Sequence, residues 1–215
     1  MKNQSLKLSV QLLIVSFFVL SCSNSDDSPE ETLVFEIGQE YQGGIIFYLD
    51  NTAEHGLIAY PNDLVDAPWG CFHQPDPVPP TVPIAQNDGI GFGLQNTLAI
   101  IEYCNEPNSA ASLAYNLSGN DYNDWYLPSI DELALIYEHR DLIGGFPDLN
   151  NIPDEDGFFI YASSSEGWVT NDGDGGFLYL NYQVYDFSNT TVFPDSRNIF
   201  TSKGNDAKVR PIRSF

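Results

Sequence analysis

The stretch Tyr122–Tyr137 reads YNDWYLPSIDELALIY and holds the clearest structural signals in the sequence. Ser129 and Glu132 have the spacing of a capping box, in which each side chain binds the backbone amide of the other residue. A helix is therefore predicted from Ile130, and apolar residues recur along it at helical spacing. The aromatic run Tyr122–Leu127 predicts a short strand that ends before a proline.

Outward from this stretch, strands and helices are predicted in separate blocks. Tyr41–Asp50 and Gly56–Pro61 indicate a β-hairpin, while Ser109–Leu117 and the apolar stripe of Leu94, Leu98 and Ile101 indicate two short helices. Further strands are predicted at residues 158–162, 177–187 and 207–215. The order of strands, helices and strands favours an α+β domain with a mainly antiparallel sheet over a parallel doubly wound fold.

The composition limits the classes of partner. The chain has 215 residues, with 30 acidic and 8 basic side chains and a formal charge of −22. Its apolar fraction of 42% and aromatic fraction of 13% predict a packed core rather than a disordered acidic chain. The acidic excess argues against nucleic acids, anionic membranes and sulfated polysaccharides as ligands, because all of them carry like charge.

The N-terminus has the pattern of a bacterial lipoprotein. Lys2 and Lys7 precede an apolar run, Leu12–Leu20, that is too short to span a membrane. The following Val19-Leu20-Ser21-Cys22 resembles a lipobox, so residues 1–21 are predicted as a signal peptide and Cys22 as the lipidated residue. The alternative is an ordinary signal peptide with an incidental cysteine. We expect an acidic tether at residues 22–33, a domain at 34–215, and a lipid-anchored location at the bacterial outer membrane, exposed on the surface.

The remaining cysteines and basic residues each suggest a pairing. With Cys22 lipidated, Cys71 and Cys104 are predicted to form a disulfide in an oxidising compartment, and the alternative is two buried thiols. Without the two lysines of the signal peptide the charge becomes −24, and five of the six remaining basic residues lie in the last nineteen positions. Either this tail neutralises an acidic body or the molecule is electrically polarised; Arg210 and Arg213 are expected to form ion pairs.

Seven stretches together resemble one domain family, the C-terminal domain of the Legionella collagen-like adhesin (Lcl-type). They are 41–48 (YQGGIIFY), 56–59 (GLIA), 69–71 (WGC), 90–97 (IGFGLQNT, leading to Cys104), 124–133 (DWYLPSIDEL), 163–166 (SSSE) and 209–213 (VRPIR). The resemblance covers about residues 38–215. It implies a C-type lectin-like fold with paired terminal strands, two or three short helices and a long loop-rich face.

The resemblance also implies an adhesin-like, ligand-binding role rather than an enzyme, and it supports the Cys71–Cys104 bridge. The sequence departs from the family at Ala162, where a tryptophan is usual. The adhesin that names the family is associated with sulfated glycosaminoglycans, which a charge of −24 disfavours here. No binding residue is carried over, because the matching motifs look structural.

The candidate binding residues lie within the predicted loops around 145–200. Asn171, Asp172 and Asp174 offer oxygen ligands at alternate spacing for calcium, although a terminal glutamate is missing; the alternative is an Asp/Asn-Gly turn. Trp168 beside them could stack on a sugar ring, and the alternative is a rim residue that packs on its own loop. A second acidic cluster, Asp154–Asp156, is a weaker calcium candidate.

Catalytic and zinc patterns are weak. His55, His73 and His139 lack metal spacing. Ser163–Ser165 lack a nucleophile elbow and are expected to bind backbone in the loop face, and a disulfide would remove Cys71 as a partner for His73.

We expect a surface protein that binds a glycan or a protein, and the alternatives are an assembly module, with oligomerisation possible, and a polysaccharide hydrolase with a carboxylate pair.

Overall fold

The structure of the protein is a computed structural model. It describes residues 34–72, 82–148, 159–167, 170–171, 177–178, 181–188 and 196–215. Residues 34–215 form one compact unit. The predicted signal peptide, Cys22 and the tether lie outside the described residues. The compact unit contains its own buried clusters and its own disulfide, so it has what an independently folding domain requires.

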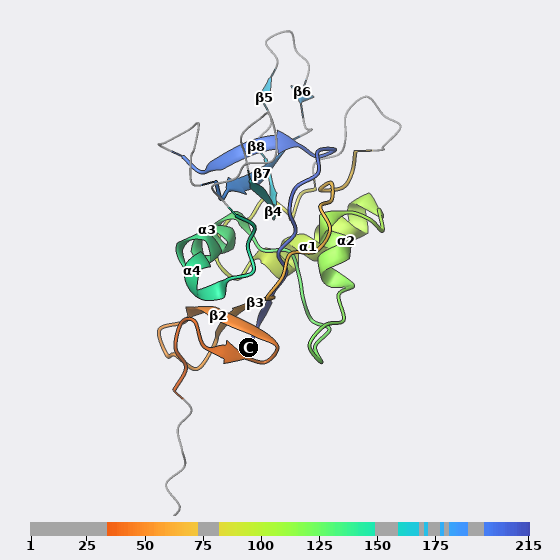
Figure 1. Ribbon diagram of the computed structural model, residues 1–215. Helices are drawn as coiled ribbons and strands as arrows, with labels where there is room; N and C mark the ends of the chain where they lie inside the picture. Colours follow the sequence, from red (N-terminus) through yellow and green to blue (C-terminus); the bar gives the residue numbers. More distant parts are fainter. Residues whose placement is uncertain are drawn as a thin grey trace, which may run out of the picture. The chain divides into compact units, whose positions relative to one another are not determined.

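The fold is α+β, as the order of elements predicted, with two antiparallel sheets and few helices (Figure 1). The four-stranded sheet has the order β1-β2-β3-β9, and the three-stranded sheet has the order β4-β7-β8. A further pair, β5-β6, stands between β4 and β7 in the sequence. The strands are β1 (Glu40–Tyr41), β2 (Gly44–Leu49), β3 (Gly56–Ala59), β4 (Ile160–Glu166), β5 (Thr170–Asn171), β6 (Phe177–Leu178), β7 (Asn181–Asp186), β8 (Asn198–Ser202) and β9 (Ile212–Ser214).

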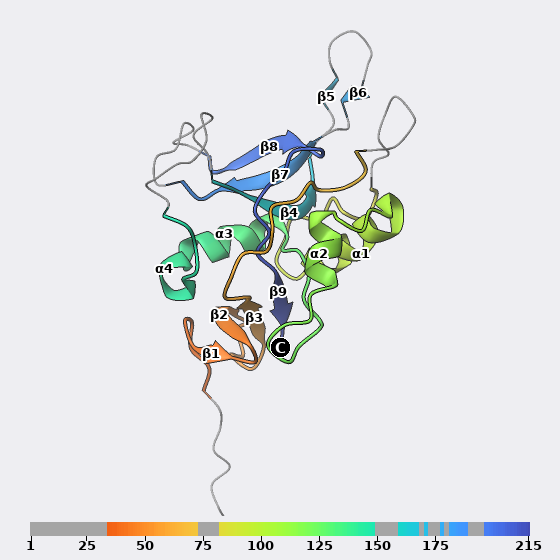
Figure 2. The same cartoon turned by 45° about the vertical axis from the view of Figure 1, so that its right-hand side comes forward.

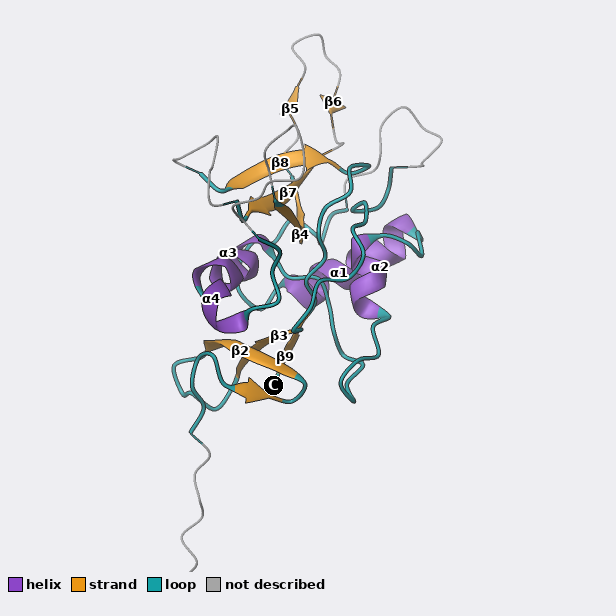
Figure 3. Cartoon of the chain, viewed as in Figure 1, coloured by secondary structure: helices purple, strands orange, loops and turns teal. Residues whose placement is uncertain are grey.

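The helices lie between the two larger sheets (Figures 1 and 2). They are α1 (Gly93–Cys104), α2 (Ala110–Tyr115), α3 (Ile130–Glu138) and α4 (Arg140–Ile143). Helix α3 contacts β2 of the first sheet and both β4 and β7 of the second, while α1 packs against α2 and β4. Long loops join these elements (Figure 3).

Three apolar clusters form the core. One joins α1 and α2 to Trp69, the two cysteines and β7; the second joins α3 to Phe47, Tyr161 and Phe187. The third is built on Ile46, Ile58 and Trp125. Trp69 and Trp125 are both fully buried and belong to this core.

The strongest local predictions are confirmed. The hairpin pairs β2 with β3, for example Ile46 opposite Ile58. Helix α3 begins with the predicted capping box: the Ser129 hydroxyl accepts from the amide of Glu132, and the Glu132 carboxylate accepts from the amide of Ser129. Both signals need only local chemistry, so neighbouring elements do not override them.

Helix α1 exists where it was predicted, but of its predicted apolar stripe only Ile101 packs against the core, beside the buried Ala99 and Ile100. Leu94 and Leu98 are exposed, whereas Asn96 and Thr97 are fully buried. Thr97 explains the orientation, because its hydroxyl donates to the Gly93 carbonyl at 2.7 Å and accepts from the Leu127 amide at 3.1 Å. The helix is therefore turned inward by hydrogen bonds and by the disulfide at its C-terminal residue.

Two predicted strands are wrong. Tyr122–Leu127 is not a strand; only isolated bridges form there, one of them between Tyr126 and Ile212, because the Trp125 indole turns into the core and donates to the Gly119 carbonyl. The strand predicted at 207–215 is reduced to β9. The preceding residues cross between the sheets, with Ala207 paired to Ala67 and Lys208 to Tyr161.

The second sheet also differs from the prediction. Strand β4 extends through Ser163–Ser165, which were expected in a loop. The strand predicted at 177–187 appears as β6 and β7, with residues 179–180 outside the described part. Strand β8 was not predicted, because Asn198–Ser202 (NIFTS) is short and has no clear alternation.

The Cys71–Cys104 disulfide is present, as predicted, across a sequence separation of 33 residues. Replacing both cysteines by alanine is expected to lower the free energy of unfolding by about 3–4 kcal/mol, because the bridge restricts the unfolded chain. Urea unfolding of the oxidised protein and the variant measures the difference. Reduction of the unaltered protein is the control and should reproduce the effect; an unfolding midpoint that does not move would contradict the prediction.

Candidate functional site

The predicted ligand residues belong to the connection between β4 and β7. Trp168, Asp172 and Asp174 lie outside the described residues, and of Asn171 only the backbone is described, in β5. We call the two described ends of this connection, Gly167 and Asn181, the loop root. There the Gly167 amide donates to the Asn181 carbonyl at 3.0 Å. The end of β4 and the start of β7 are therefore fixed side by side.

An exposed aromatic ring lies at this root. Phe200 of β8 is 48% exposed and stands directly opposite Gln183 of β7. Its ring lies so close to Gly167 that a β-carbon there would come within 2.9 Å of Phe200 Cδ1. Gly167 thus permits the close approach that holds the ring beside the loop root.

A chain of polar side chains continues from Phe200 across the same face. Asn198 is two residues away on β8, and its amide nitrogen donates to Gln183 Oε1 at 2.8 Å. The Gln183 amide nitrogen in turn donates to Asp88 Oδ1 at 2.6 Å. We name this group, Asp88, Gln183, Asn198 and Phe200, the polar platform. The pairing across β7 and β8 and the bond to Asp88 fix the position of its members.

The electrostatics of the platform are negative. The Asp131 amide donates to the Asp88 carbonyl at 3.1 Å, so two acidic residues meet at one edge. Burial raises the pKa of the Asp131 carboxyl, and the charge of Asp88 raises it further. Gln183 is 3% exposed and its amide is used in these internal bonds. The carboxylates of Asp88 and Asp131 and the ring of Phe200 are the groups that can bind hydroxyl groups and the apolar side of a ring.

The serine run, Ser163–Ser165 of β4, fixes the backbone around the platform. All three residues of Ser163–Ser165 are buried. The Ser163 hydroxyl donates to the Gln183 carbonyl at 2.6 Å, and the Ser165 hydroxyl donates to the Asn87 carbonyl at 3.2 Å and accepts from the Ile130 amide. The expectation of backbone bonding is confirmed for these two residues, although they bind from a strand.

Glu132 has a role beyond the predicted capping box. Its carboxylate also accepts from the Gly91 amide at 2.8 Å, and the Ser129 hydroxyl donates to the Gly89 carbonyl at 2.9 Å. Burial raises the pKa of Glu132, against the opposing effect of these backbone amides. The capping box therefore also anchors the turn that follows Asp88.

Basic residues of the C-terminal tail pair with acidic residues of the body, as one of the two predicted alternatives has it. Among the described residues these ion pairs are Lys203–Glu166, Lys208–Asp66, Arg210–Asp63 and Arg213–Asp124. Arg197 donates to the carbonyls of Asp186 and Ser188. The hydrogen bond from Arg213, together with its charge, lowers the pKa of Asp124.

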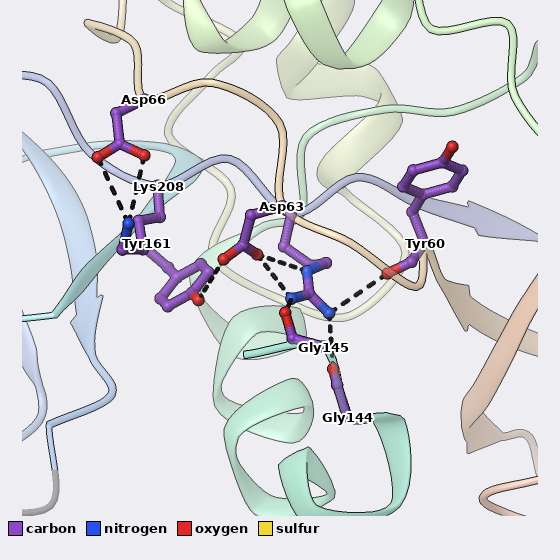
Figure 4. A network of polar contacts seen from close by, with 8 residues as sticks. Tyr60, Asp63, Asp66, Gly144, Gly145, Tyr161 and Lys208 are labelled. Carbon is purple, nitrogen blue, oxygen red and sulfur yellow. Dashed lines mark hydrogen bonds and ion pairs between the residues drawn. The ribbon is translucent and has the colours of Figure 1, made fainter. Parts of the chain in front are cut away.

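Arg210 and Lys203 are the two fully buried cations among these, and Arg210 makes the larger set of hydrogen bonds. Its Nε donates to Asp63 Oδ1 at 2.7 Å, and its other nitrogens donate to the carbonyls of Tyr60, Gly144 and Gly145 (Figure 4). The Tyr161 hydroxyl donates to the second Asp63 oxygen at 2.8 Å. The network joins β3, β4, α4 and the C-terminal tail, so it is structural.

Among the described residues, no group of three or more His, Cys, Asp and Glu side chains could hold a metal ion. The calcium candidates Asp172 and Asp174 lie outside these residues. Within the same residues, no helix is long and apolar enough to cross a membrane.

The platform has no sequence motif that could have identified it. Asp88 and Gln183 are 95 residues apart, and only the fold brings them together. The one available signal was a glutamine within the alternating run at 177–187, whose side chain proves to be almost fully buried.

Comparison with known proteins adds no assignment: no protein-family model matches the chain, and no curated protein is significantly similar to it.

Proposed function

We propose that the chain is a lipid-anchored protein of the outer membrane, exposed on the cell surface, whose domain binds a ligand without catalysing a reaction. The lipobox-like sequence before Cys22 supports the anchor. The proposed fold is C-type lectin-like, as in the Lcl-type family. It is supported by the antiparallel pairing of β3 with β9, which places N-terminal and C-terminal strands in one sheet.

The observation that carries the binding role is the polar platform at the root of the 168–180 connection. Its carboxylates, beside the half-exposed ring of Phe200, suit the hydroxyl groups and apolar faces of a neutral glycan, and the amides of Gln183 and Asn198 hold them in place. The acidic excess of the chain opposes a sulfated glycan. Trp168, Asp172 and Asp174 are proposed to extend the same site, with calcium as an additional ligand.

A glycan array probed with residues 34–215 tests this proposal, once in calcium and once in EDTA. We expect binding to a restricted set of neutral sugars. The variant F200S/N198A should bind at least about tenfold more weakly, because it removes the ring and the amide from the platform.

The matched control is Y103S, which removes an equally exposed aromatic ring from α1. Binding that is equal in F200S/N198A and in the unaltered domain would contradict the platform. Binding that is lost only in the triple variant W168A/D172N/D174N would restrict the site to the connection. Loss in EDTA would establish calcium as part of the site.

A protein-assembly role is the second candidate, and the exposed apolar side of α1 is the observation that favours it. It predicts no glycan binding and a protein partner instead.

A further inference from the structure

The exposed side of α1 carries two leucines, Leu94 and Leu98, beside the polar Gln95 and Glu102. Leu94 and Leu98 are one helical turn apart, and Ile90 and Phe92 stand in the turn that leads into the helix. The four side chains are between 39% and 44% exposed. We name them the apolar ridge. Neighbouring exposed apolar residues of this kind mark interaction surfaces more often than isolated ones do.

The ridge is held outward by partly buried hydrogen bonds. The turn before α1 is fixed by the bonds from Gly91 to Glu132 and from Ser129 to Gly89. The Asn96 side chain, from within the helix, donates to the Asn87 carbonyl at 2.6 Å. Gly93 is packed so tightly that a β-carbon would come within 2.9 Å of the Leu127 carbonyl oxygen. The helix cannot rotate to bury its leucines without breaking these contacts.

The charges around the ridge are negative. Asp88 lies at the start of the turn, Asp131 of α3 donates its backbone amide to the Asp88 carbonyl, and the exposed Glu102 follows Leu98 by one helical turn. The six Lys and Arg residues in the described part of the chain are all engaged: four in ion pairs, and Arg140 and Arg197 with backbone carbonyls. Few basic side chains within the molecule are therefore available to neutralise the acidic residues around the apolar ridge.

We propose that the apolar ridge docks a basic amphipathic segment of a partner protein, with its apolar side on the leucines and its Lys and Arg on the acidic rim. Charge complementarity selects this occupant. A second copy of the chain would bring another formal charge of −22, and an anionic lipid surface would be repelled in the same way. This surface shares Asp88 with the polar platform but does not include Gln183, Asn198 or Phe200, and its proposal does not depend on a glycan.

The test measures binding of residues 34–215 to a labelled helical peptide of leucine and lysine with one apolar face, by fluorescence anisotropy. The variant L94Q/L98Q should bind at least about tenfold more weakly, because it removes the centre of the ridge. The matched control L142Q changes an exposed leucine on α4 and should leave binding unchanged. Circular dichroism confirms that each variant is folded.

Two further peptides separate the contribution of the apolar face from that of the positive charges. A peptide of the same composition, scrambled so that it has no apolar face, should bind more weakly than the amphipathic one, as should a leucine–glutamate version. Equal binding of the scrambled peptide, or of the L94Q/L98Q variant, would overturn the proposal. So would ridge-dependent dimerisation without peptide, or ridge-dependent binding to anionic vesicles, because another occupant would then be identified. The platform variant F200S/N198A should bind the peptide normally, which keeps the two proposed surfaces distinguishable.

Discussion

Replacing Arg210 by methionine is expected to lower the free energy of unfolding by about 3–5 kcal/mol, the usual effect of removing one partner from a buried ion pair. The Arg210 side chain is fully buried, and that of Asp63 is 16% exposed. The substitution leaves Asp63 without its cation and the carbonyls of Gly144 and Gly145 without their donors. Urea unfolding followed by circular dichroism measures the loss.

Lys208 provides a matched control two residues away (Figure 4). Its ammonium lies 3.5 Å from Asp66, and both side chains are partly exposed to solvent. Replacing Lys208 by methionine should change the stability by no more than about 1 kcal/mol, because exposed pairs contribute little. Similar losses in the two variants would show that the burial of Arg210 does not determine its contribution.

Replacing Lys203 by methionine is expected to have an effect of similar size, about 3–5 kcal/mol. Lys203 is fully buried beside Trp69, with its ammonium 4.5 Å from the centre of the ring, and it pairs with Glu166. Burial lowers the pKa of Lys203, while Glu166 opposes that shift. The variant leaves a buried carboxylate with the Val82 amide but without its cation.

The double variant K203M/E166Q isolates the cost of the unpaired charge. A glutamine at 166 can still accept from the Val82 amide, so the double variant should recover part of the stability lost in K203M. Thermal and urea unfolding of the single and double variants give the coupling. A double variant that is less stable than K203M would show that packing around Lys203, rather than the unpaired charge, causes the loss.

Local chemistry was predictable from the sequence. The capping box of Ser129 and Glu132 depends on residues three positions apart, and the disulfide follows from the number of cysteines left after lipidation of Cys22 is assumed. The use of the basic tail as counter-charge followed from composition. The individual partners did not, because Asp63 lies 147 residues before Arg210 and any of many acids could have taken its place.

Orientation and long-range assembly were not predictable. The leucines of α1 form a helical stripe that normally marks the core, yet Thr97 and Asn96 face inward because backbone groups of distant segments need their hydrogen bonds. The polar platform likewise consists of single polar residues from separate segments, with no spacing rule to link them. The predicted ligand residues, Trp168, Asp172 and Asp174, remain predictions.

The order of synthesis gives the C-terminal tail a further significance. Asp124 precedes Arg213 by 89 residues, and β3 receives β9 as its neighbour only after residues 212–214 have left the ribosome. A translation product that stops before Arg210 lacks these contacts, however well its earlier helices form. Such a product is therefore expected to stay open to proteases.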